Sequence, residues 1–116
     1  MHFNPITWLV LAFATTVAAD EMTVVTTCPL FGACNSFNAL WHSAYDNFWV
    51  NANEGCRDPS HPDMTELCMD WGNQRAHFYF AGQGKRCLRL FSSVGIGQCY
   101  GAPCTIQRWH EVTCNW

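Results

Sequence analysis

The pattern of apolar positions from Asn35 to Val50 predicts an amphipathic helix. The apolar side chains recur at i, i+3, i+4 and i+7 over more than three turns, at Phe37, Leu40, Trp41, Ala44, Tyr45, Phe48 and Trp49. Polar side chains take the opposite face, and Asn35 or Ser36 can cap the first turn. We expect the rest of the chain to cover this stripe, so that Trp41, Tyr45 and Trp49 are buried.

A second, shorter helix is predicted between Ser60 and Gly72. Ser60 and Asp63 have the spacing of a capping box, and Pro62 suits a first helical turn. Apolar residues then recur with helical spacing at Met64, Leu67, Cys68 and Trp71. Gly72 is placed to end the helix.

Alternating, β-prone segments predict an antiparallel sheet around these helices. Met22–Thr27 is expected to form a first strand, and Ala76–Phe80 with Arg86–Phe91 a hairpin across the loop Ala81–Lys85. Two more strands are predicted, at Ile96–Tyr100 and Ile106–Cys114. The predicted fold class is α+β, with one long amphipathic helix and a short second helix packed on a curled antiparallel sheet.

Residues 1–19 have the features of a cleavable signal peptide. An apolar run from Ile6 to Val17 precedes the small residues Val17-Ala18-Ala19, which predicts cleavage before Asp20. The run is shorter than the roughly 20 residues that span a bilayer. Residues 20–116 are then expected to form a single disulfide-rich secreted domain.

All eight cysteines lie in the predicted mature part, at Cys28, Cys34, Cys56, Cys68, Cys87, Cys99, Cys104 and Cys114. An even number in a short exported chain predicts about four disulfides and an extracellular location. The spacing alone does not determine the pairing, and we predict that Cys28 pairs with Cys114 to join the two ends. Cys99, Cys104, His110 and Cys114 also have zinc-like spacing, but oxidised sulfurs cannot ligate zinc, so no metal or other cofactor is predicted.

Charge is distributed unevenly along the predicted domain. Residues 20–70 carry eight acids and one base, and residues 71–116 carry five bases and one acid. The basic half either complements the acidic half within the fold or offers a surface to an anionic partner.

Known catalytic signatures are absent from the sequence, and an enzyme is not the favoured interpretation. A small ribonuclease-like hydrolase stays open as an alternative, with His77 and His110 as acid and base and Arg89 as the phosphate-binding cation. The competing interpretation makes both histidines partly exposed residues of the sheet.

Aromatic residues suggest where a binding surface could lie. The predicted domain has fourteen Phe, Tyr and Trp residues, more than one helix stripe needs. They either fill the core of a small domain or form exposed binding platforms. We predict a contact surface formed by Lys85, Arg86, Arg89, Trp109 and Trp116.

The sequence as a whole resembles the small secreted cysteine-rich proteins of filamentous fungi, many of which are candidate effectors of plant pathogens. The resemblance rests on the signal segment ending Val17-Ala18-Ala19, the eight cysteines, the position of Cys114 and the lack of enzyme motifs. It implies a secreted, monomeric effector or toxin-like protein that binds a host protein or cell-wall polysaccharide without catalysis. Nucleic-acid binding and stable membrane insertion are not expected. A membrane-active antimicrobial or killer-type protein is a further alternative, disfavoured by the net charge of −3.

Overall fold

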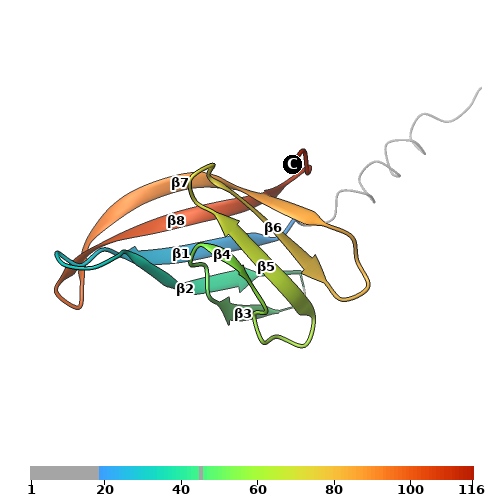
Figure 1. Cartoon of the computed structure of the whole chain (residues 1–116), viewed down its shortest axis with the longest axis horizontal. Helices are drawn as coiled ribbons and strands as arrows, with labels where there is room; N and C mark the ends of the chain where they lie inside the picture. Colours follow the sequence, from blue (N-terminus) through green and yellow to red (C-terminus); the bar gives the residue numbers. More distant parts are fainter. Residues whose placement is uncertain (1–18, 45) are drawn as a thin grey trace, which may run out of the picture.

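The computed structural model describes residues 19–44 and 46–116, which fold into one sheet of eight antiparallel strands (Figure 1). Within these residues there is no helix. The strands are β1 Glu21–Thr27, β2 Asn35–His42, β3 Asn47–Val50, β4 Gly55–Arg57, β5 Met64–Asp70, β6 Arg75–Phe80, β7 Arg86–Cys99 and β8 Ala102–Val112. The predicted α+β class is therefore wrong, and the described chain is all-β.

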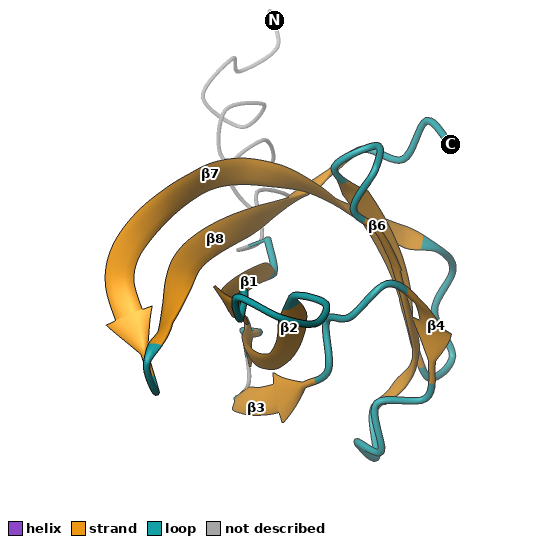
Figure 2. Ribbon diagram, turned by 60° about the vertical axis from the view of Figure 1, so that its left-hand side comes forward, coloured by secondary structure: helices purple, strands orange, loops and turns teal. Residues whose placement is uncertain are grey.

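The strand order places the first and last strands at the centre of the sheet. The order is β3-β2-β1-β8-β7-β6-β5-β4, so every neighbouring pair is consecutive in sequence except β1 with β8. The sheet curls into a half-barrel whose edge strands, β3 and β4, do not pair with each other (Figure 2). β8 is last in the chain but has a neighbour on each side.

The concave face of the half-barrel holds an aromatic core. Trp41 and Phe78 are fully buried and meet edge to face, with ring centres 4.6 Å apart. Trp109 is also fully buried and lies 5.1 Å from Trp71. Since β8 is central, Trp109 points into this core and not to a free surface.

The predicted helix over Asn35–Val50 is instead the hairpin of β2 and β3. Between the two strands, the Ser43 amide donates to the Asp46 carbonyl at 3.1 Å. Alternation along the strands buries Trp41 but leaves Trp49 69% exposed. The expectation of a fully buried stripe is therefore wrong for Trp49, and Tyr45 lies outside the described residues.

The second predicted helix is also a strand. β5 pairs with β4 and β6, and Leu67 faces the core while its neighbour Cys68 lies opposite Cys56. The disulfide on the outer face explains why both faces of β5 carry apolar residues. Apolar residues on both faces of the strand therefore gave the spacing that is typical of a helix.

The remaining strand predictions agree better with the structure. The strands predicted at Met22–Thr27 and Ala76–Phe80 and the loop Ala81–Lys85 are confirmed as β1, β6 and the connection to β7. Arg86–Phe91 is only the first part of a strand that continues to Cys99. β8 begins at Ala102, earlier than predicted.

Four disulfides join all eight cysteines: Cys28–Cys34, Cys56–Cys68, Cys87–Cys114 and Cys99–Cys104. The predicted number is confirmed, and the predicted Cys28–Cys114 bridge is wrong. Disulfides of this number suggest an extracellular or secreted protein. The predicted signal segment lies outside the described residues except for Ala19. Over the described part of the chain, no helix has the length and apolar character needed to cross a membrane.

Candidate functional site

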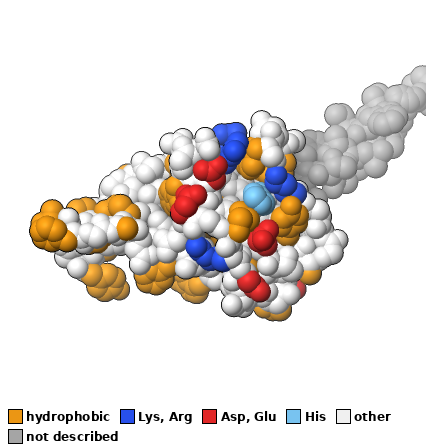
Figure 3. Space-filling view, viewed as in Figure 1, with side chains coloured by type: hydrophobic (Ala, Val, Ile, Leu, Met, Phe, Trp, Pro, Cys, Tyr) orange, Lys and Arg blue, Asp and Glu red, His pale blue; other side chains and the backbone are white. Residues whose placement is uncertain are grey.

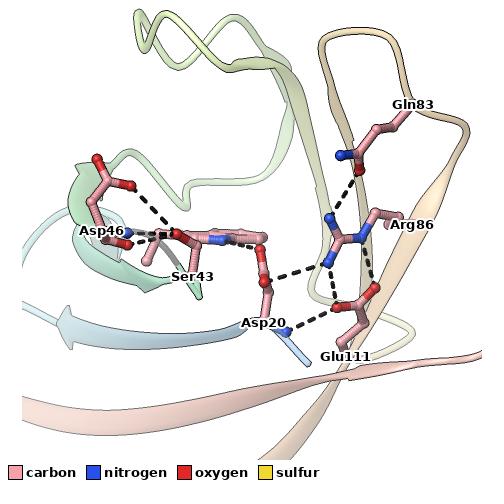
Figure 4. Close-up of polar contacts among 7 residues, drawn as sticks. Asp20, Ser43, Asp46, Gln83, Arg86 and Glu111 are labelled. Atoms are coloured by element: carbon pink, nitrogen blue, oxygen red, sulfur yellow. Dashed lines mark hydrogen bonds and ion pairs between the residues drawn. The ribbon is translucent and has the colours of Figure 1, made fainter. Parts of the chain in front are cut away.

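A charged cluster joins the start of β1 to the end of β8. Arg86 donates to both carboxylate oxygens of Glu111 at 2.8 Å, to Gln83 at 3.0 Å, and lies 3.4 Å from the Asp20 carboxylate (Figure 4). The Asp20 backbone N–H donates to Glu111 at 2.9 Å, and the indole N–H of Trp41 donates to the Asp20 carboxylate at 2.9 Å. Every group in this cluster is matched by a partner of opposite charge or by a hydrogen bond.

Burial and hydrogen bonding act in opposite directions on the two carboxylates. Burial raises the pKa of Asp20 above its ordinary value, and the hydrogen bond from Trp41 and the charge of Arg86 offset only part of this rise. Burial also acts to raise the pKa of Glu111, but the hydrogen bonds from Arg86 and the Asp20 amide outweigh it and lower that pKa. Hydrogen bonds to Glu111 raise the pKa of Arg86. The cluster is an ion-pair network in which Arg86 and Glu111 favour each other's charged form.

A cavity of about 460 Å³ adjoins the cluster, with Asp20, Asp46 and Asp63 among its lining residues. The His61 ring stacks on Phe48 at 3.7 Å between ring centres, and its Nε2 lies 3.6 Å from the Asp46 carboxylate. Asp46, Phe48 and His61 therefore lie together in the lining of the cavity, which Asp20 and Arg86 of the charged cluster also line.

The predicted contact surface is divided by the structure. Trp109 is buried in the core, and Arg86 is bound to Glu111. The Lys85 ammonium donates to the Trp116 carbonyl, and the Arg89 guanidinium lies 5.0 Å from the centre of the Trp116 ring. Only Lys85, Arg89 and Trp116 remain together near the surface.

The residues proposed for hydrolysis lie on one face of the sheet. Arg89 is directly opposite His110, and His77 is opposite Cys87, two residues before Arg89. The His110 ring stacks on Phe91, and burial lowers the pKa of His77. Of the two cavities we describe, neither is lined by His77, Arg89 or His110.

Sulfur atoms near these histidines are not available as metal ligands. Cys56 and Cys68 lie close to His77 but are bonded to each other. Cys99, Cys104 and Cys114 of the zinc-like spacing are likewise disulfide-bonded. A zinc site therefore cannot form from either set while the disulfides are intact.

Away from the charged cluster, one part of the molecule contains no Asp, Glu, Lys, Arg or His side chain. We call this part the arm. It comprises residues 22–41 and 90–107, which run side by side in β1, β2, β7 and β8. The rest of the described chain is the base, and Figure 3 shows the charged side chains gathered over it and none over the arm on that face. Charge is thus separated along the molecule.

Next to the base, the arm contributes Met22, Val24, Ala39 and Trp41 to the apolar core, but farther from the base its interior is polar and its exterior apolar. Thr26, Ser36 and Gln107 are buried and joined by hydrogen bonds of 2.7 and 2.9 Å. Large apolar side chains point outward and are exposed, at Leu30, Phe31, Phe37, Phe91, Val94, Ile96 and Tyr100. Exposed apolar clusters of this kind mark contact surfaces. Sequence reasoning missed the arm, although its signal, two long stretches without charge, is visible in the chain.

No family model matches the chain, and neither the curated proteins nor the solved structures include a match. The geometry of the base and the arm is therefore the ground for a functional assignment.

Proposed function

We propose that this is a secreted effector or toxin-like protein that binds a host or cell-wall component without catalysis, and that the arm makes the contact. The observation that carries the proposal is the part of the arm farther from the base, which has a buried polar network and outward apolar side chains. A monomer in water gains nothing from exposing Leu30 and Phe31, which are 88% and 87% exposed. Their burial against a partner is favourable.

The arm replaces the hairpin end of β6 and β7 as the proposed contact surface. If Arg86 turned outward to bind a partner, the partly buried carboxylates beside it would lose their cation. If Trp109 turned outward, it would leave a large cavity in the core. Arg89 and Trp116 remain as a secondary, cationic surface.

A cell-binding assay tests the proposal. Fluorescently labelled, fully oxidised protein is incubated with intact plant cells, wall-stripped protoplasts and isolated cell walls, and the bound fraction is measured. We expect the arm variant Leu30→Ser/Phe31→Ser/Tyr100→Asn to bind at least about tenfold more weakly, because each apolar side chain contributes on the order of 1 kcal/mol when it is buried at a contact.

The control is Arg89→Ala, which alters the base and leaves the arm intact. Equal binding by the arm variant and the unaltered protein would refute the arm as the contact surface. Loss of binding in Arg89→Ala alone would return the contact to the hairpin end.

A further inference from the structure

We infer that the arm docks on a lipid bilayer with neutral headgroups, with its tip entering the interfacial layer. We call the loop 28–34 and the turn 99–104 the tip. The inference rests on the proposed function, since it names the partner of the arm. Docking of this kind is peripheral and does not require the chain to span the membrane.

Two disulfide-closed loops form the tip and lie next to each other. Cys28–Cys34 closes the first loop and Cys99–Cys104 the second. The Cys28 N–H donates to the Pro103 carbonyl at 2.9 Å, which joins the two loops. Leu30 and Phe31 of one loop and Tyr100 of the other are therefore held on a common, rigid projection.

Tyr100 adopts a backbone conformation that disfavours its own side chain. Its φ is +56° and that of Gly101 is +81°, as a two-residue type I′ turn requires. Asn and Gly suit such positions, and other residues bear a steric cost. The Tyr100 side chain is fully exposed, so no burial within the protein offsets this cost. A contact outside the protein accounts for a tyrosine here.

The chemistry of the arm fits lipid better than it fits a protein partner. Bilayers exclude charged side chains, and the arm has none. Protein interfaces usually combine an apolar centre with arginine and a polar rim, over about 800 Å² on each partner. The tip lies at a narrow end of the molecule (Figure 3), and residues 28–34 and 99–104 include no charged side chain.

The depth of docking is limited by the backbone of the tip. Loop amides and carbonyls that lack partners cannot enter the hydrocarbon layer without a large cost. Tyrosine is suited to the headgroup level, where its ring is in an apolar layer and its hydroxyl in a wet one. Leu30 and Phe31 then reach the upper acyl chains while Tyr100 lies at the headgroups.

The main alternative to a lipid bilayer is a second copy of the chain that pairs with the outer edge of β7. β6 pairs with β7 only from Arg86 to Arg89, so the edge beyond this point is open in the described sheet. Irregularities at Leu90/Ser92 and Gly95/Gly97 interrupt the regular ladder of that strand. Bulges of this kind oppose edge-to-edge pairing, which favours lipid as the occupant of the arm.

Vesicle flotation tests the inference. Oxidised protein is mixed with vesicles of phosphatidylcholine alone or of phosphatidylcholine with phosphatidylserine, at low and high salt, and the co-floating fraction gives the partition coefficient. We expect binding that changes less than about twofold with salt, because the arm has no charge to be screened. The variant Leu30→Ser/Phe31→Ser/Tyr100→Asn should bind about 100-fold more weakly, and Trp49→Ser, which removes an exposed ring from the base, by less than about threefold.

The outcomes separate the inference from the proposed function. If the unaltered protein does not float but the arm variant loses cell binding, the arm is a contact surface and its partner is not lipid. Flotation that requires anionic lipid and disappears at high salt would overturn the inference by assigning binding to the charged base. Sedimentation analysis without vesicles gives the last readout, and a dimer abolished by the arm variant would assign the arm to a second copy.

Discussion

The base and the arm both include parts of β1, β2, β7 and β8, but they differ in where their polar and apolar groups lie. In the base, aromatic side chains such as Phe78 and Trp109 lie inside and charged groups lie outside or are paired. In the part of the arm farther from the base, hydrogen-bonded Thr26 and Gln107 lie inside and apolar side chains lie outside. One sheet can therefore support a stabilising half and a presenting half.

The disulfides of the base and of the arm also differ, in the length of chain that each one closes. Cys87–Cys114 of the base closes 27 residues, whereas Cys28–Cys34 and Cys99–Cys104 of the arm close only 6 and 5. Long closures restrict the unfolded chain more than short ones. The base bridges serve global stability, and the arm bridges fix the shape of a tip.

The largest expected change in stability comes from removing these disulfides one at a time. Replacing Cys87 and Cys114 by alanine should lower the free energy of unfolding by about 3.5 kcal/mol, and replacing Cys99 and Cys104 by about 2 kcal/mol, from loop-closure entropy. Denaturant unfolding followed by tryptophan fluorescence measures both. A larger loss of stability on removing Cys99–Cys104 than on removing Cys87–Cys114 would contradict the assignment of global stability to the base.

Arg86→Met should have the next largest effect. It leaves Asp20 and Glu111 side by side without their cation, and should lower the free energy of unfolding at neutral pH by about 3 kcal/mol. The matched control is Arg108→Met on the exposed surface of β8, which should change stability by less than about 0.5 kcal/mol. A loss below about 1 kcal/mol in Arg86→Met would mean that the cluster does not stabilise the base.

The smallest expected effect has the opposite sign. Tyr100→Asn should raise the free energy of unfolding by about 0.5 kcal/mol, because asparagine tolerates a positive φ better than tyrosine does. Tyr100→Ala removes the ring but keeps the steric cost, so it should leave stability nearly unchanged. Thermal unfolding of the three proteins compares them, and a destabilised Tyr100→Asn would show that the ring serves the fold and not a partner.

Strands with a period of two were predictable from the sequence, whereas the two helices were not. Between Phe37 and Trp49 the apolar spacing fits a helix, yet it also fits a hairpin in which Trp41 is opposite Phe48 and Ala39 opposite Val50. Aromatic residues favour strands, and the asparagines and serines of this stretch are poor helix formers. Propensity should have outweighed periodicity here.

The site was harder to predict because exposure depends on strand order. Trp109 was predicted to belong to a contact surface, but pairing of β8 with β1 places it in the core. Conversely, Leu30 and Phe31 lie between two cysteines and gave no periodic signal. Only the absence of charge from residues 22–41 and 90–107 pointed to the arm.

Pairing of β1 with β8 also determines when folding can finish. Glu21 lies opposite His110, so the centre of the sheet joins the two ends of the described chain. Contacts between such distant segments form slowly, and β1 and β7 both lack a neighbour until β8 has been synthesised. The sheet is therefore completed only after β8 has been synthesised, and any chain truncated before Ala102 would keep two open strand edges and remain a target for aggregation or proteolysis.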